Sequence, residues 1–437
     1  MGGETTDALM RDSSAVLPPN PYGERGFVSE ALLAPEQAII AYFARAQLAP
    51  PGIESVPLDS AGGRVLASDA VAREDYPTHV RSTMDGFAIL AAGGTQRKIV
   101  GEIRMGQAPP RAIGAGETLR IPTGGALPEG ADAVIPIEDV DERDGTILLR
   151  SSVATGENLI PRASDVRAGE CALQCGRRLG APELGLLATL GYAQVDVFKR
   201  PRFGVISTGD ELVDVDAPLQ LGQVRDSNRY AIAASLRAMG AEALHLPRVD
   251  DDPEALRRAL AGALEQCDGI VLTGGSSVGE RDFTPRIVGE LGAPGPIVHG
   301  IRVKPGKPTL LAAIGGKPIL GLPGNPAAAL MILEAVARPI VTACAGEASV
   351  RYASIAATAS QPFAGREGWT WFVPARLTLV AGKVLAEPLR LRSALVSLLA
   401  RAAGYVTLTE THPRIEAGEM VQVTPFSGGG APIEHAR

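Results

Sequence analysis

"VLTGGSSVGERDF", residues 271–283, places two glycines and two serines directly behind a β-branched apolar run. Such a run is typical of a buried strand, and Gly274 and Gly275 allow a backbone turn that other residues resist. The N–H groups of the turn, with Ser276 and Ser277 as further donors, suit a phosphate at the end of a parallel strand. We therefore predict a phosphate-binding turn. The alternative is an ordinary turn, and no Gly-Lys-Ser/Thr follows to make it a Walker loop.

Carboxylates follow strand ends at two further places, in "STGDEL" (207–212) and "VDDDP" (249–253), and Asp282 follows the glycine turn itself. Because the carboxyl ends of parallel strands meet at one edge of a sheet, we expect these acids to lie together. Carboxylates beside a phosphate are the usual ligands of Mg²⁺. The alternatives are a simple helix cap at Asp252 and a solvated surface triplet at 280–282.

Two lysines lie on a loop that contains two prolines, in "VKPGKP" (303–308). A pair of surface lysines is usually solvated. Pro305 and Pro308 restrict this loop, which lowers the entropic cost of holding an anion between Lys304 and Lys307. The pattern favours an anion site on this loop.

Strands and helices alternate from residue 202 to about 343, which predicts a doubly wound parallel sheet with helices on both faces. "NRYAIAASLRAMG" is a helix that Gly240 can end, and "DPEALRRALAGALEQC" is a helix capped by Asp252. In "PILGLPGNPAAALMILEAVARPI" a strand, a turn and a helix follow one another, with Asn325 as the cap and Pro326 in the first turn.

The regions on either side of residues 202–343 have a different residue pattern. Short β-branched segments alternate with Gly/Pro turns from about 65 to 150, which predicts a β-rich module. "APELGLLATLGYAQVDVF" (181–198) reads as a short helix and a strand, and 34–47 as a helix. The apolar side chains of that first helix that recur at helical spacing are Ile39, Ile40 and Phe43. After 343, the alternation of Trp369, Trp371, Val373, Ala375 and Leu377 predicts a half-buried strand in a small β-rich domain.

The composition narrows the function classes. The 437 residues are 45% hydrophobic and 21% charged, as in ordinary soluble proteins. A net charge of −7 without a basic run argues against nucleic-acid binding, and we find no apolar run of about 18 residues, so no membrane span is expected. Four cysteines indicate a reducing compartment, and we expect a cytoplasmic protein.

Seven motifs occur in this order: "RSTMDGFA" (81–88), "TGGALPEGADAV" (123–134), "GENL" (156–159), "STGDEL", "TGGSSVGERDF", "KPGKP" and "GLPGNP" (321–326). Together they resemble the motifs of the MoeA/gephyrin E-domain family of molybdopterin molybdenumtransferases. The resemblance covers roughly residues 28–425. It implies a multidomain homodimer whose α/β domain binds molybdopterin, with β-rich modules beside it. The implied parts are a flexible tail (1–27), a discontinuous linking α+β domain (28–68 and 160–200), a β-rich domain (69–159), the α/β domain (201–342) and a C-terminal β domain (343–430).

The resemblance also implies a reaction. The family inserts molybdate into adenylylated molybdopterin and releases AMP with the help of Mg²⁺, which completes molybdenum cofactor biosynthesis. Partners would be small-molecule substrates, other enzymes of the same biosynthesis and the molybdoenzymes that receive the cofactor.

The residues that match the family's functional positions fall into four sets. The catalytic set is Asp85, Thr123, Asp165, Glu211, Asp251 and Asp282, of which Glu211 and Asp282 would hold Mg²⁺. The pterin and phosphate set is Gly274, Gly275, Ser276, Ser277, Pro323, Gly324 and Asn325. The molybdate set is Lys304, Lys307, Arg376 and Ser397. One departure is that Ala163-Ser164-Asp165 stands where relatives commonly have Gly-Glu-Asp.

Two other functions fit part of the sequence. A molybdopterin adenylyltransferase shares the α/β fold and the glycine turn, but it is small and lacks the modules around 65–165 and 343–425. A non-catalytic scaffold, as in some relatives, is the other alternative, and the intact set of acids argues against it.

Overall fold

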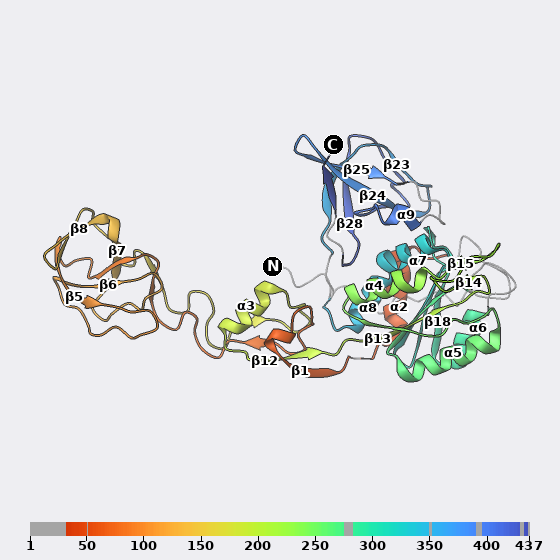
Figure 1. Cartoon of the computed structure of the whole chain (residues 1–437), viewed down its shortest axis with the longest axis horizontal. Coiled ribbons are helices and arrows are strands. Elements are labelled where there is room, and N and C mark those ends of the chain that lie inside the picture. The colour runs from red at the N-terminus through yellow and green to blue at the C-terminus, as the bar shows by residue number, and fades with distance from the viewer. Residues whose placement is uncertain are drawn as a thin grey trace. The chain divides into compact units, whose positions relative to one another are not determined.

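The computed structural model describes residues 32–49, 51–274, 283–348, 352–389, 396–428 and 432–435. The predicted tail 1–27 lies outside these residues. The chain forms two units, shown in Figure 1. The larger unit contains the described residues of 1–55, 63–67 and 196–437, and the smaller unit contains 56–62 and 68–195.

A six-stranded sheet forms the centre of the larger unit, in the order β16-β13-β17-β21-β20-β18. Its strands are β13 (Arg202–Ser207), β16 (Glu242–His245), β17 (Gly269–Thr273), β18 (Pro294–His299), β20 (Leu310–Ile314) and β21 (Lys317–Leu322). β16, β13, β17 and β21 are parallel, which confirms the predicted α/β sheet. β20 is antiparallel to both neighbours, and Gly315 and Gly316, both with positive φ, form the two-residue hairpin turn that joins it to β21.

Helices cover both faces of this sheet (Figure 1). One face packs against α2 (Pro35–Ala46), α4 (Asn228–Ala238), α7 (Pro326–Ile332), the π-helical turn η4 (Leu333–Ala337) and α8 (Arg338–Cys344). The other packs against α5 (Pro253–Gln266) and α6 (Thr284–Leu291). The strand residues alternate accordingly: Val271 belongs to the first core, and Ile270 and Leu272 to the second.

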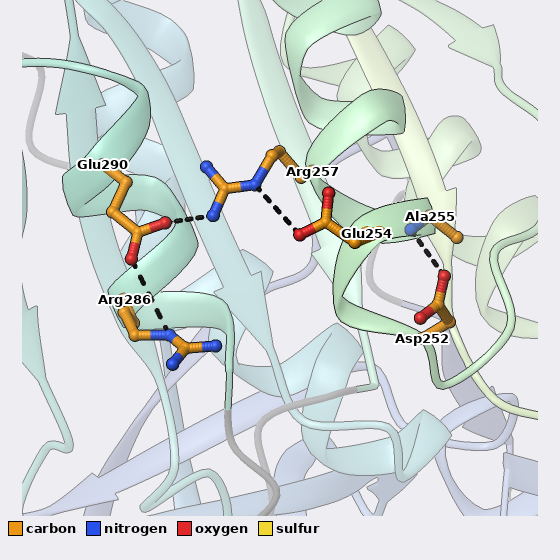
Figure 2. Close-up of polar contacts among 6 residues, drawn as sticks. All are labelled: Asp252, Glu254, Ala255, Arg257, Arg286 and Glu290. Atoms are coloured by element: carbon orange, nitrogen blue, oxygen red, sulfur yellow. Dashed lines mark hydrogen bonds and ion pairs between the residues drawn. The ribbon is translucent and has the colours of Figure 1, made fainter.

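The predicted ends of α4 and α5 are confirmed. Gly240 has a φ of 95° just after α4, and the Asp252 carboxylate accepts the N–H of Ala255 at 2.8 Å in the first turn of α5. Figure 2 shows this cap together with the Arg257–Glu290 ion pair that joins α5 to α6. Arg257 pairs with Glu290 of α6 and lies 3.6 Å from Glu254 on its own helix.

The first helix, α2, has the predicted position but a different buried face. Ala38, Tyr42 and Ala46 are fully buried in the first core, whereas Ile40 and Phe43 remain 47% and 37% exposed. Helical spacing fixes which residues share a face, but the location of the neighbouring sheet decides which face is buried. The placement of α2 in the α/β core also differs from the predicted linking domain 28–68.

One continuous helical stretch, Pro326–Cys344, is long and apolar enough by composition to cross a membrane, which corrects the expectation that no such segment exists. About 67% of its most apolar window is buried inside the structure. Its acidic residue, Glu334, is buried and accepts hydrogen bonds from Ser235 Oγ at 2.6 Å and the Ser427 N–H at 2.9 Å. This stretch therefore packs as a core helix of the larger unit.

The C-terminal β region closes on itself. Five strands pair in the order β24-β25-β22-β28-β26, and β26 pairs again with β24. The elements are β19 (Val303–Lys304), β22 (Ile355–Ala359), β23 (Phe363–Ala364), β24 (Thr370–Val380), β25 (Lys383–Pro388), α9 (Val396–Leu399), β26 (Gly404–Leu408), β27 (Arg414–Ile415), β28 (Met420–Pro425) and β29 (Ile433–His435). The predicted face is confirmed from Trp371 to Leu377, because Ala375 and Leu377 lie in this region's core and Trp371 and Val373 pack against it. Trp369 precedes β24, and Phe372 on the opposite face is buried in the first core, so the strand is not half-buried there.

A second six-stranded sheet, in the order β7-β4-β6-β5-β9-β8, forms the smaller unit and confirms the β-rich module. Its strands are β4 (Gly86–Ile89), β5 (Gln96–Glu102), β6 (Glu117–Ile121), β7 (Ala133–Pro136), β8 (Val140–Arg143) and β9 (Thr146–Leu149). Two short ladders, β3 (Arg81–Ser82) with β10 (Leu159–Ile160) and β2 (Ala70–Val71) with β11 (Cys171–Leu173), accompany helix α3 (Ala181–Thr189). β1 (Ile53–Pro57) pairs with β12 (Gln194–Phe198).

Candidate functional site

Three strand ends meet at one edge of the α/β sheet, as the sequence predicts. Thr208, just past β13, donates its N–H to the carbonyl of Thr273 at the end of β17, at 2.8 Å. Gly274 has a φ of 87°, and a Cβ on it would lie 2.3 Å from the Thr208 carbonyl oxygen. A Cβ on Gly324, which follows β21, would lie 3.4 Å from the Cα of Gly274. Glycine is therefore required at 274 both for the turn and for the close approach of the neighbouring chain.

Asn228, at the start of α4, holds the third of these turns in place. It is 8% exposed, and its side-chain amide donates to the carbonyl of Gly324 at 2.8 Å. The sequence does not mark Asn228 as a site residue, because an asparagine at the start of a helix is usually a local cap. Its partner is distant in sequence, so the contact has no local signal.

Two buried polar atoms at this edge have no hydrogen-bond partner in the part of the chain that the structure describes. They are Ser207 Oγ, at the end of β13, and Asn325 Oδ1, at the start of α7. Asn325 is at the predicted N-cap position, but its side chain makes no capping hydrogen bond, which corrects that prediction. A bound polar ligand would supply partners to atoms of this kind.

The acids of the same edge come from two loops. Glu211 is exposed beyond β13, and Asp251 follows β16. The loops are joined where the Asp251 N–H donates to the Asp210 carboxylate at 3.1 Å. Among the described residues no group of three His, Cys, Asp or Glu side chains has metal-site geometry. Mg²⁺ commonly takes one or two carboxylates plus substrate phosphates, and the exposed oxygens here fit that mode.

Four residues of the predicted site lie outside the described residues. They are Gly275, Ser276, Ser277 and Asp282. Pro323, which is described, is buried directly after β21.

The lysine loop is held firmly to the sheet beneath it. Thr309 is fully buried and donates its hydroxyl to the Gly306 carbonyl at 2.6 Å, and its N–H donates to the Lys307 carbonyl at 2.9 Å. A Cβ on Gly306 would lie 2.1 Å from Ile332. Lys304 is exposed at the end of this loop, and Lys307 is half-buried. The loop can therefore present cations from a fixed backbone.

The other two residues of the predicted molybdate set lie elsewhere in the larger unit. Arg376 is on β24, where Glu387 binds its guanidinium at 3.1 Å through Nε and Glu434 lies 3.8 Å from Nη1. The hydrogen bond that Arg376 donates to Glu387 raises the pKa of Arg376. Ser397 is exposed on α9.

In the smaller unit, the structure brings Asp85 and Thr123 together. The Asp85 carboxylate accepts the N–H of Thr123 at 2.7 Å. Ser82, which is 1% exposed, fixes the turn, because its N–H donates to Gly125 and its carbonyl accepts from Gly124. Gly86 is required behind Asp85, since a Cβ there would lie 2.0 Å from the Ile135 carbonyl oxygen.

Asp165 lies on a loop that runs beside residues 76–77. Its N–H donates to Tyr76, and the N–H of Ala163 donates to Pro77. Asp75 anchors the same loop through the Ala168 N–H at 2.9 Å and Arg162 Nε at 2.7 Å. These hydrogen bonds, the one from Ala168 first, lower the pKa of Asp75. Ala163 has a φ of 56°, in the left-handed region that favours glycine.

Comparison with known families covers nearly all of the described chain. Residues 30–191 match the MoeA N-terminal region (domain I and II), 204–343 match a probable molybdopterin binding domain, and 356–426 match the MoeA C-terminal region (domain IV).

Similar proteins are found among curated relatives and solved structures. The molybdopterin molybdenumtransferase of Staphylococcus aureus is 32% identical over 84% of this chain and 90% of its own length, and that of Bacillus subtilis is 32% identical over 85% and 89%. The relative of the same name from Nostoc sp. is 35% identical over 67% of this chain and 70% of its own. A molybdopterin biosynthesis MoeA protein from Pyrococcus horikosii matches in structure with a TM-score of 0.72 and 32% identity, over 91% of this chain and all of that one.

Proposed function

This chain belongs to the molybdopterin molybdenumtransferase family, and from that premise we propose that it inserts molybdenum into molybdopterin. The substrate in this proposal is adenylylated molybdopterin. Molybdate is the second substrate, and AMP leaves as the new cofactor forms. The expected place of action is the cytoplasm.

The observation that carries the proposal is the meeting of backbone at Thr208, Gly274 and Gly324. No Cβ stands between the turns after β17 and β21, so N–H groups and the positive end of α7 are open to an anion. The edge between β13 and β17 is also the point where the chain order reverses within the sheet, because β16 lies on one side of β13 and β17 on the other. Open α/β sheets bind ligands at this point.

In this proposal, residues of different charge bind different parts of the substrates. The glycine turn would bind the terminal phosphates, and Gly275, Ser276, Ser277 and Asn325 would add donors and acceptors around them. Glu211 and Asp282 would hold Mg²⁺, which would neutralise phosphate charge when bound. Asp251 would belong to the same group of catalytic carboxylates. Lys304 and Lys307 would attract molybdate, which is a dianion.

Asp85, Thr123 and Asp165 lie in the smaller unit, and we propose that they serve the α/β site of a second copy in a homodimer. The exposed apolar side chains of α2, Ile40 and Phe43, support an association surface. Sedimentation of the purified protein tests this, and an active monomer would contradict it.

The two alternative functions predict different outcomes in two parallel reactions. The protein is incubated with adenylylated molybdopterin and molybdate, with and without Mg²⁺, and AMP and reconstituted molybdoenzyme activity are measured. The proposal expects AMP release that depends on both Mg²⁺ and molybdate. An adenylyltransferase would show no molybdate-dependent AMP release here, but in a parallel reaction with molybdopterin and ATP it would form the adenylylated compound. A scaffold would be inactive in both reactions. Full-length similarity to the transferases through all three regions supports the first outcome.

A further inference from the structure

A cleft of about 440 Å³ opens in the larger unit between the lysine loop and the C-terminal strands. Lys304 and Pro305 line one side, and Trp371, Pro374 and Pro388 contribute apolar walls. Arg414, from β27, also lines it. Among the described lining residues, the charged ones are these two cations, Lys304 and Arg414. The cleft is therefore suited to an anion.

The backbone near each of the two cations is fixed. Lys304 lies opposite Trp371 in the β19–β24 ladder. Arg302, two residues before Lys304, forms a paired ion bridge with Glu410 at 2.8 and 2.9 Å, four residues before Arg414. Ion pairing with two parallel hydrogen bonds fixes orientation as well as distance. This ion pair thus joins the segment that carries Lys304 to the segment that leads to Arg414.

Arg414 can turn toward an incoming anion. Its ion pair with Glu416 is exposed, with 59% and 57% of the two side chains accessible. Exposed pairs of this kind contribute little and are easily exchanged. Its guanidinium presents a planar fork of donors that matches an oxyanion. Trp371 adds a buried Nε1–H with no acceptor within the described residues.

Arg376 is a poorer candidate for the same role. On β24 it is five residues beyond Trp371, about 16 Å along the strand. Two carboxylates, Glu387 and Glu434, already surround its guanidinium. It does not line the cleft as the described residues form it.

We propose that the tetrahedral oxyanion binds between Lys304 and Arg414, and that Arg414 supplies the second cation in place of Arg376. This inference rests on the proposed function, in which that oxyanion is molybdate. Neither residue type nor spacing marks Arg414 in the sequence, because β27 is brought to the cleft only by pairing with β23.

Equilibrium dialysis of the full-length protein against molybdate, with the bound metal measured by mass spectrometry, tests the proposal. Arg414→Ala should weaken binding about tenfold to a hundredfold, the amount expected for one charge-assisted hydrogen bond. Arg376→Ala should change it less than about threefold. Arg150→Ala is the matched control, because Arg150 is an exposed arginine paired with Asp141 in the smaller unit. It should leave binding unchanged.

Glu416→Gln tests whether Arg414 acts through its charge on the anion or only through a structural ion pair with Glu416. It removes the carboxylate that competes for Arg414, so binding should stay the same or tighten by up to about fivefold. A loss as large as that of Arg414→Ala would overturn the proposal, because the ion pair would then act structurally. Loss with Arg376→Ala and none with Arg414→Ala would also overturn it. If the wild-type protein binds no molybdate at all, the proposed function fails first, and the two failures are thereby distinguished.

Discussion

The tripeptide Thr-Gly-Gly occurs twice at predicted sites, at 123–125 in the smaller unit and at 273–275 in the larger one, and the structure uses it differently. Thr123 is exposed and its N–H binds the Asp85 carboxylate. Thr273 is 1% exposed and its carbonyl accepts from Thr208. Gly124 and Gly274 both have positive φ, of 80° and 87°. Apart from this backbone angle, the surroundings of the two glycines differ.

The difference lies in what surrounds each first glycine. A Cβ on Gly124 would lie 3.4 Å from the end of the flexible Met105 side chain. A Cβ on Gly274 would lie 2.3 Å from backbone oxygen and 2.6 Å from the Thr208 hydroxyl. The first glycine serves only the turn, whereas the second also allows two strand ends to touch. The role of the Thr-Gly-Gly motif therefore depends on the residues that surround it in the fold.

The largest expected effect comes from Gly274→Ala. Left-handed strain and overpacking against Thr208 should together lower the free energy of unfolding by about 3–4 kcal/mol. Gly124→Ala should cost only the backbone strain less the chain entropy that alanine saves, about 0.5–1 kcal/mol. Denaturant unfolding followed by circular dichroism measures both, and Trp369 and Trp371 fluorescence reports on the larger unit. Equal losses would contradict the difference between the two turns.

The second effect concerns the charge at the exposed turn. In Asp85→Asn the amide oxygen can still accept the Thr123 N–H, so the turn should survive while the negative charge is lost. We expect unchanged thermal unfolding and AMP release reduced about a hundredfold, the lower range for loss of an acid–base group. Asp132→Asn is the control, because Asp132 also accepts a backbone N–H, from Ala91 at 2.6 Å, away from the site. Full activity in Asp85→Asn would remove Asp85 from the catalytic set.

The sequence predicts the elements of the α/β domain well because their signals are local. Asp252 and Gly240 mark helix ends through bonds made within one turn. The meeting of strand ends at Thr208 and Gly274 is also predictable, since parallel strands of one sheet finish at one edge.

What the sequence could not predict depends on distant neighbours. The buried face of α2 is Ala38 and Tyr42 because the sheet lies there, although Ile40 and Phe43 are more apolar. The roles of Asn228 and Arg414 follow from contacts that span long stretches of chain. The same applies to Arg376, whose charge is compensated by Glu387 from the next strand and Glu434 from β29.

Two asparagines, one in each unit, extend this comparison, because each donates its side-chain amide to a backbone carbonyl distant in sequence. The amide of Asn228 donates to Gly324, and the amide of Asn158 donates to Val134, both at 2.8 Å. Alanine is tolerated at position 228 at the start of a helix, and glycine is tolerated at position 158, where φ is 58°. Each substitution therefore removes mainly one hydrogen bond. Each should cost about 1 kcal/mol of stability.

Their kinetic effects should differ. We expect Asn228→Ala alone to raise the KM for adenylylated molybdopterin several-fold, because only Gly324 belongs to the proposed phosphate turn. Asn228→Gln, which keeps the amide, should recover part of that loss. If Asn158→Gly raised the KM equally, Asn228 would have no specific positioning role.

The smallest expected effect is a gain in stability at Ala163, on the loop that carries Asp165 in the smaller unit. A φ of 56° costs an L-residue about 1–2 kcal/mol, and glycine avoids this cost. Glycine also loses about 0.5–1 kcal/mol more than alanine through chain entropy on folding. Ala163→Gly should therefore stabilise the protein by about 0.5 kcal/mol. Ala168 is the control, because it lies on the same loop without a positive φ, and Ala168→Gly should destabilise by the entropic amount alone. Opposite signs in thermal unfolding would show that the backbone conformation at 163 is strained by its side chain, and a loss at both positions would refute it.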